Sequence, residues 1–146
     1  MRYVLDSNII LFYARNSDRK RIIEEQYQPF SEDNTAIISI VTVAELISLA
    51  QRQKWGERKQ KVLQKIFDSL VIVEIRYSDL IQAYVAIDTY SQGNDENRPL
   101  KTSARNMGKN DIWIAATTHI TDAKLLTTDK DFDHLNGEFF EIASIK

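Results

Sequence analysis

Short apolar runs alternate along this chain with longer amphipathic segments, and the alternation predicts an α/β fold. The short runs are rich in β-branched residues and have the length of buried strands. In the segments between them, apolar residues recur at the spacing of one helix face, most clearly from Glu57 to Leu70. We expect strands at residues 2–5, 35–40, 71–75, 124–128 and 139–142. We expect helices at about 9–15, 17–27, 42–54, 57–70, 78–91 and 111–119.

This order of elements favours a central, mostly parallel sheet of four to five strands with helices on both faces. The 146 residues are enough for a single domain. One long irregular stretch interrupts the pattern at residues 93–109, which are polar and hold two of the four glycines. A loop of this length inside a compact domain is usually functional or disordered.

Composition and charge exclude some classes and leave others open. The sequence has no cysteine, which rules out disulfides and cysteine-ligated metals. No apolar stretch approaches the roughly 20 residues of a membrane span, and residues 1–4 do not resemble a secretory signal, so we expect a cytoplasmic protein. The net charge of −2 gives no sign of nucleic-acid binding. Residues 52–65 carry six Lys or Arg against one Glu, either as a face for a polyanion or as a solvated helix face.

Four acidic residues stand where a fold of this class places ligands. Asp6 and Asp129 each follow the carboxyl end of a predicted strand, Glu45 lies one turn into a helix, and Asp111 opens another. Each has a local structural explanation as a turn, cap or helix-dipole residue, and Thr42 with Glu45 also fits a capping box. Their shared location is not explained in this way. Because ligands of open α/β sheets bind beyond the carboxyl ends of the strands, we expect the four acids to converge there.

Converging carboxylates favour a metal site. Carboxylates a few ångströms apart raise each other's pKa unless a cation lies between them. Oxygen ligands without His or Cys suit Mg²⁺ or Mn²⁺ better than Zn²⁺. Such an ion can orient and deprotonate a water and offset charge on a phosphate under attack. The pattern therefore predicts metal-dependent phosphodiester hydrolysis without a protein nucleophile.

At these residues the chain resembles PIN-domain ribonucleases, especially the VapC-type toxins of bacterial toxin–antitoxin pairs. Four segments carry the resemblance, in the family's order and over residues 4–132 of the chain. They are Val4-Leu-Asp-Ser-Asn8, Thr42-Val-Ala-Glu45, Asn110-Asp-Ile-Trp-Ile-Ala-Ala116 and Leu126-Thr-Thr-Asp-Lys-Asp-Phe132.

The resemblance implies a single PIN-like nuclease domain over residues 1–146 and a set of site residues. The implied metal-binding and catalytic residues are Asp6, Glu45, Asp111 and Asp129, with Asp131 as a substitute for Asp129 and with Asn8 and Thr42 as supporting neighbours. The implied activity is Mg²⁺- or Mn²⁺-dependent cleavage of RNA, as an endoribonuclease. The implied partners are a second copy in a homodimer and a small antitoxin protein that reaches the active site.

The chain departs from the family pattern at residues 93–109, which form a longer connection before the third motif. Three interpretations of this loop are open: a substrate-binding flap beside the site, a contact for the antitoxin, or a mobile insertion without a role. In the first case Lys101, Arg105 and Lys109 are possible RNA contacts.

Other functions remain to be weighed. A catalytically silent RNA- or protein-binding module on the same fold is the main alternative, although all four acids are present. A phosphatase or phospho-receiver site fits poorly, because position 8 is Asn and the strand ending at Ile75 has no following Asp. We interpret His119, His134 and Trp55 as packing or surface residues.

Overall fold

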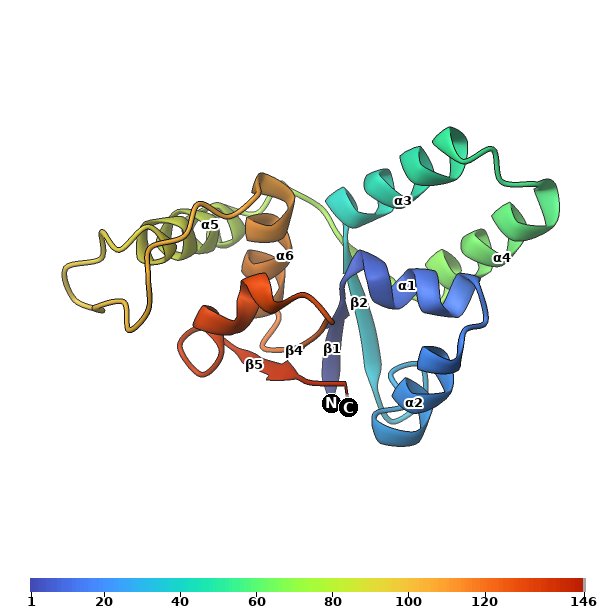
Figure 1. Ribbon diagram of the computed structural model, residues 1–146, viewed down its shortest axis with the longest axis horizontal. Helices are drawn as coiled ribbons and strands as arrows, with labels where there is room; N and C mark the ends of the chain where they lie inside the picture. Colours follow the sequence, from blue (N-terminus) through green and yellow to red (C-terminus); the bar gives the residue numbers. More distant parts are fainter. Residues whose placement is uncertain (146) are drawn as a thin grey trace.

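Five strands and six α-helices make up the fold of this protein in a computed structural model that describes residues 1–145 (Figure 1). The strands are β1 (Arg2–Leu5), β2 (Thr35–Ser39), β3 (Val71–Val73), β4 (Lys124–Leu126) and β5 (Glu141–Ala143). The helices are α1 (Ser7–Ala14), α2 (Asp18–Gln26), α3 (Ile40–Arg52), α4 (Glu57–Asp68), α5 (Ser78–Ser91) and α6 (Lys109–Ile120), with a 3₁₀ helix, η1 (Lys130–Leu135). Among the described residues, no helix is long and apolar enough to cross a lipid bilayer.

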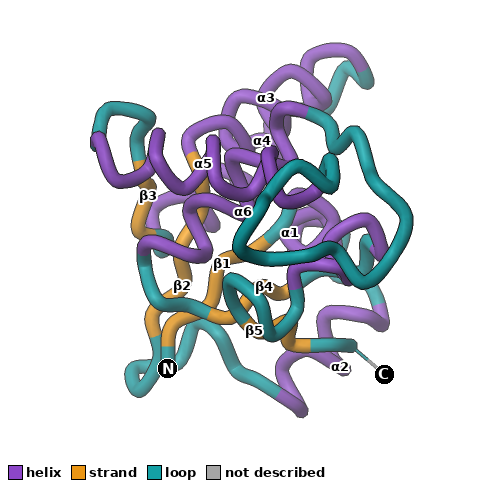
Figure 2. Tube along the Cα trace, turned by 90° about the vertical axis from the view of Figure 1, so that its left-hand side faces the viewer, coloured by secondary structure: helices purple, strands orange, loops and turns teal. Residues whose placement is uncertain are grey.

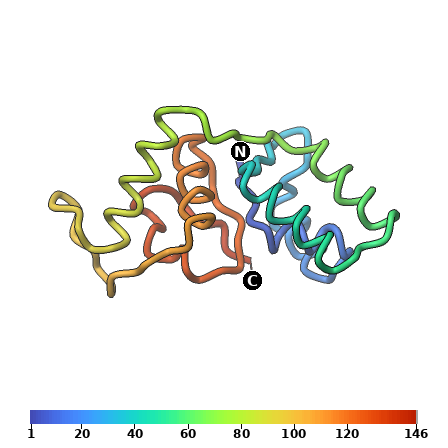
Figure 3. The backbone as a smooth tube through the Cα atoms, turned by 90° about the horizontal axis from the view of Figure 1, so that it is seen from above, coloured from blue at the N-terminus to red at the C-terminus, as the bar shows by residue number. Residues whose placement is uncertain are grey.

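The sheet is parallel throughout and is covered on both faces, which confirms the predicted architecture. Side chains alternate across the strands, because successive residues of a strand point to opposite faces. Tyr3 and Leu5 belong to the apolar core shared with α1, α2, α3 and α4, whereas Val4 belongs to the core formed with α5, α6 and η1. Figures 1 and 3 show these two groups of helices on either side of the sheet.

The strand order is β3-β2-β1-β4-β5, and this order creates one special position. From β1 the chain continues outward through β2 and β3, and it returns to the other side of β1 with β4 and β5. The crevice between β1 and β4, at their carboxyl ends, is therefore a topological switch point, where open α/β sheets bind their ligands. The pairing continues one residue past β1, since the backbone N–H of Asp6 donates to the carbonyl of Leu126 at 3.1 Å.

The start of α3 differs from the prediction. The helix begins at Ile40 and not near Thr42, because the strand before it ends at Ser39. The side chain of Ser39 is the N-cap and accepts a 3.2 Å hydrogen bond from the backbone N–H of Val41. The capping box that we considered for Thr42 and Glu45 is therefore wrong, and both residues lie inside the helix.

The C-terminal third also differs in detail. Strands β3 and β4 have three residues each, and β5 begins at Glu141 rather than at residue 139. The turn of 3₁₀ helix at η1 was not predicted, because a six-residue element gives little periodicity. The connection from α5 to α6, residues 92–108, has no helix or strand, as expected for most of its length. This segment, which we call the 92–108 loop, is the foremost teal segment in Figure 2.

Candidate active site

Asp6 lies directly after β1 and is the N-cap of α1, as the polar residues after the first apolar run predicted. It is 4% exposed, and both of its carboxylate oxygens accept hydrogen bonds. The backbone N–H of Ser7 donates to Oδ1 at 2.7 Å, and the Thr127 hydroxyl donates to Oδ2 at 2.7 Å. Burial, and to a smaller degree the charge of Asp129, raise the pKa of Asp6 above its usual range.

Thr127 joins the two strands at the switch point. Its hydroxyl donates to Asp6 and accepts a 3.0 Å hydrogen bond from the backbone N–H of Asp129. Asp129 in turn is the N-cap of η1, and its Oδ1 accepts a 2.9 Å hydrogen bond from the backbone N–H of Asp131. A continuous chain of hydrogen bonds therefore runs from the end of β1 to the start of η1.

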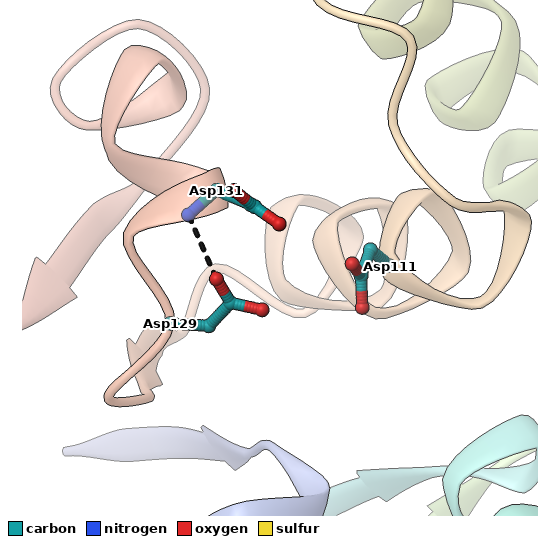
Figure 4. A group of neighbouring side chains, drawn as sticks. All are labelled: Asp111, Asp129 and Asp131. Atoms are coloured by element: carbon teal, nitrogen blue, oxygen red, sulfur yellow. Dashed lines mark hydrogen bonds between the residues drawn. The ribbon is translucent and has the colours of Figure 1, made fainter.

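Three carboxylates meet at this edge of the sheet. One oxygen of Asp111, one of Asp129 and one of Asp131 all lie within 4.8 Å of one another (Figure 4). We call these three residues the acid cluster. Helix α6 contributes Asp111 from its first turn, and the segment that follows β4 contributes the other two. Because α6 leads into β4, its N-terminus lies at the carboxyl edge of the sheet, where we expected Asp111.

Asp6 and Glu45 are outside this group of three but within its electrostatic reach. Partial loss of hydration and the charge of Asp6 raise the pKa of Glu45, which is on the second turn of α3. Burial, followed by the charges of Asp6 and Asp129, raises the pKa of Asp111 to about 6. Glu45 and Asp131 add smaller contributions in the same direction. The structure thus brings the four predicted acids and the substitute Asp131 into one strongly negative region.

The two predicted supporting residues have different environments. Asn8 is exposed on the first turn of α1. Thr42 is completely buried, and its hydroxyl has no hydrogen-bond partner among the described residues. A buried hydroxyl without a partner is costly, and this one lies on α3 one turn before Glu45.

The basic residues predicted to contact RNA are not equivalent. Lys101 is exposed and lies 3.5 Å from a carboxylate oxygen of Glu138. Arg105 is the one that faces the acids, with Nη1 3.8 Å from Oδ1 of Asp131. Lys109 is exposed at the start of α6, two residues before Asp111.

Of the residues interpreted as packing or surface residues, Trp55 and His134 are buried and His119 is exposed. Trp55 is 8% exposed, and the ammonium group of Lys59 lies 4.1 Å from its ring centre. A ring nitrogen of His119 is hydrogen-bonded to the carbonyl of Phe139 at 2.8 Å. His134 is buried and hydrogen-bonded to Ser91, and burial lowers its pKa.

The donor set fits a hard divalent cation. All the ligand atoms on offer are carboxylate oxygens, and the cluster combines several negative charges with partial burial. Mg²⁺ and Mn²⁺ prefer such oxygens, and a bound cation would remove the repulsion that raises the Asp111 pKa. Asp129 and Asp131 both lie in the cluster, and each offers an oxygen to such an ion.

Sequence reasoning missed the role of Thr127. The residue lies within the fourth motif, and it follows a buried strand directly. A polar residue at the end of a predicted buried strand was the available signal, and the structure shows that this residue is 5% exposed. Only the pairing of β1 with β4 shows that its partner is Asp6, 121 positions away in the chain.

Comparison with known proteins identifies the family. The PIN domain model matches residues 3–138. Ribonuclease VapC1 of Haemophilus influenzae strain R2866 is 27% identical over 136 residues, which are 92% of each chain. Among solved structures, VapBC2 from Rickettsia felis bound to a promoter DNA fragment aligns over 100% of both chains with a TM-score of 0.77 and 22% identity. VapBC-1 from nontypeable H. influenzae aligns over 97% of this chain and 98% of that one, with a TM-score of 0.71 and 24% identity. A family model that spans nearly the whole chain, on a sheet that carries its acids at the switch point, shows that this protein belongs to the PIN-domain family.

Proposed function

We propose that this protein is a metal-dependent endoribonuclease that hydrolyses RNA phosphodiester bonds. The observation that carries the proposal is the acid cluster at the switch point of a PIN-domain chain. The relative named Ribonuclease VapC1, which aligns with 92% of the chain, supports the same reaction. The alternative, a silent binding module, is disfavoured because no acid of the predicted set is replaced.

The side chains have separable roles in this proposal. Asp111 and Asp129 or Asp131 hold Mg²⁺ or Mn²⁺, since their oxygens already lie within 4.8 Å of one another. When bound, such an ion orients and activates the attacking water and offsets charge on the phosphate. Asp6 is a further proposed ligand, because its Oδ2 accepts one hydrogen bond, from Thr127, and a carboxylate oxygen keeps a second lone pair for a cation. Glu45, on α3, adds its negative charge to the same region, where it interacts electrostatically with Asp6 and Asp111.

We further propose that the protein is the toxin of a type II toxin–antitoxin pair. The relatives are named Ribonuclease VapC1 or belong to VapBC structures, and a toxin–antitoxin complex from Klebsiella pneumoniae also aligns with 96% of this chain. We propose a small antitoxin protein as the partner, and we propose that both proteins act on RNA in the cytoplasm. Expression of the chain alone is expected to arrest growth, and co-expression of a neighbouring small open reading frame to restore it.

The exposed apolar side chains favour a homodimer. Six large hydrophobic residues with exposed fractions between 39% and 58% fall within one stretch, namely Val71, Ile72, Ile75, Tyr77, Ile81 and Val85. We call this stretch the β3–α5 patch. It includes β3, which is an edge strand of the sheet formed by residues 1–145. Exposed apolar surface beside an open strand edge marks an interaction site, and a second copy is the occupant we propose.

Cleavage of a mixed RNA substrate by the purified protein tests the central proposal. We expect cleavage with Mg²⁺ or Mn²⁺, no cleavage with EDTA, and no cleavage by Asp111→Asn in the presence of metal. Circular dichroism shows whether the variant is folded. Cleavage that survives both EDTA and Asp111→Asn contradicts the proposal. Binding of RNA by a folded protein that cleaves none of the RNAs tried favours the silent module.

A further inference from the structure

The described part of the chain presents one cation at ion-pairing distance from the acid cluster, and it lies on the 92–108 loop. Nη1 of Arg105 is 3.8 Å from Oδ1 of Asp131. Both side chains are well exposed, 39% for Arg105 and 68% for Asp131. An ion pair this long and this solvated contributes little to stability, so the pair by itself does not explain the position of Arg105.

Hydrogen bonds and buried contacts hold the backbone at Arg105 and the side chain of Met107 against Ser91. The backbone N–H of Arg105 donates to the carbonyl of Ser91 at 2.7 Å. The hydroxyl of Ser91 is buried and is hydrogen-bonded to Nε2 of His134, in η1, at 2.7 Å. Two residues after Arg105, the side chain of Met107 is buried with its sulfur 3.4 Å from the Ser91 hydroxyl. The same group of contacts therefore fixes Arg105 relative to η1, the element that carries Asp131.

A second attachment holds the earlier part of the 92–108 loop. The guanidinium of Arg98 lies 4.3 Å from the ring centre of Phe139 and donates to the carbonyl of Glu138 at 3.3 Å. Figure 1 shows the loop leaving the end of α5 and returning past η1 to α6. The two arginines of the loop thus have different roles, because Arg98 attaches the loop to the segment at Glu138 and Phe139, whereas Arg105 extends from it toward the acids.

The donors of Arg105 remain available. No hydrogen bond of its guanidinium to another described residue accompanies the 3.8 Å contact with Asp131. Guanidinium is a planar fork of five donors that matches the oxygens of a phosphate and stays charged at any physiological pH. A cation fixed beside a metal-binding acid cluster, with free donors, is placed to contact a phosphate held at that cluster.

We propose that Arg105 binds the scissile phosphodiester of the RNA at the acid cluster, and that the 92–108 loop is the arm that positions it. This inference rests on the proposed nuclease function and adds a residue to it. Arg105 supplies positive charge to the phosphate, whose negative charge increases during attack by water. The phosphate replaces Asp131 as the main partner of the guanidinium.

The test compares Arg105→Gln and Arg105→Lys with Lys124→Gln. Lys124 is a matched control, because its side chain is 37% exposed, its ammonium group pairs with Glu141 at 3.3 Å, and it is the first residue of β4, at the end of the strand away from the acids. We expect Arg105→Gln to lower kcat/KM for RNA about 100-fold, Arg105→Lys to retain part of the activity, and Lys124→Gln to stay within about twofold. The Mn²⁺ affinity without RNA should be unchanged or higher in Arg105→Gln, because a positive charge near the acids is gone.

The outcomes separate this proposal from a structural role. Activity of Arg105→Gln within threefold of Lys124→Gln overturns it, and so does a loss of Mn²⁺ affinity or melting temperature that parallels the loss of activity. If the unmodified protein cleaves no RNA, the nuclease proposal fails, and fluorescence anisotropy with a short single-stranded RNA and Mn²⁺ decides the role of Arg105. Weaker Mn²⁺-dependent binding in Arg105→Gln alone supports the role. Equal binding by Arg105→Gln and Lys124→Gln overturns the proposed role, and so does the absence of RNA binding by every protein tested.

Discussion

The hydroxyl of Thr127 donates a 2.7 Å hydrogen bond to Oδ2 of Asp6, which links the end of β4 to the end of β1 across the switch point. The same hydroxyl accepts from the backbone N–H of Asp129 at 3.0 Å. One small side chain therefore sets the relative positions of two candidate site acids. Because Thr127 is 5% exposed, no water readily replaces it.

Thr127→Val is expected to lower both stability and activity. Valine keeps the shape but leaves a buried carboxylate oxygen and a backbone N–H without their partner, which costs about 1–3 kcal/mol in the free energy of unfolding. Urea unfolding measures this loss, and RNA cleavage measures the effect on kcat. Thr128→Val, at an exposed neighbouring position, is the control and should change neither. Equal behaviour of the two variants would remove Thr127 from the site.

Asp111→Asn is expected to abolish cleavage and to stabilise the metal-free protein at pH 7.5. The pKa of Asp111 is about 6, above its ordinary value of 3.8, so its ionisation opposes folding. Its favourable contribution is complete below pH 3.8 and is lost as the pH rises through 6. An amide removes this repulsion, and after allowance for solvent screening we expect a gain of about 1 kcal/mol, or roughly 2–4 °C in Tm. Asp33→Asn, in an exposed loop, should leave the Tm unchanged, and an equal shift in both variants would contradict the electrostatic explanation.

Metal binding should weaken in acid. A carboxylate must lose its proton to bind a cation, and the pKa of about 6 for Asp111 places this change between pH 7 and 5. We expect the Mn²⁺ affinity, measured by calorimetry, to fall roughly tenfold between pH 7 and pH 5, with cleavage falling in parallel. An affinity that does not change across this range would mean that Asp111 is not a ligand.

Ile81→Glu together with Val85→Glu is expected to give a monomer. The two residues are one turn apart on α5 and are 49% and 58% exposed, so charges there disrupt the β3–α5 patch without entering the core. Sedimentation velocity measures the change in mass. Ile47→Glu, which charges an exposed apolar position on α3, is the control and should remain a dimer. A monomeric unmodified protein would refute the homodimer.

The acids lie together because of the order of the elements along the chain and the order of the strands in the sheet, rather than because of any single residue. Asp6 and Asp129 were placed correctly because a strand end is visible in the sequence, and parallel strands bring their carboxyl ends to one edge. Asp111 was harder to place, because the long loop before it hides the direction in which α6 approaches the sheet. The membership of Asp131 in the cluster depends on η1, an element too short to predict.

By itself, the sequence determined the α/β class, the alternation of five strands with helices, and the four segments that carry the acids, because these depend on local periodicity and on residue type. Tertiary structure alone decided the strand order, the hydrogen bond from Thr127 to Asp6, the start of α3 at Ile40, and the position of Arg105 beside Asp131. Each of these joins residues far apart in the chain or depends on a cap that competes with a similar one nearby. The stability of each of these features depends on which surfaces pack together in the folded chain. Local sequence patterns do not contain that information.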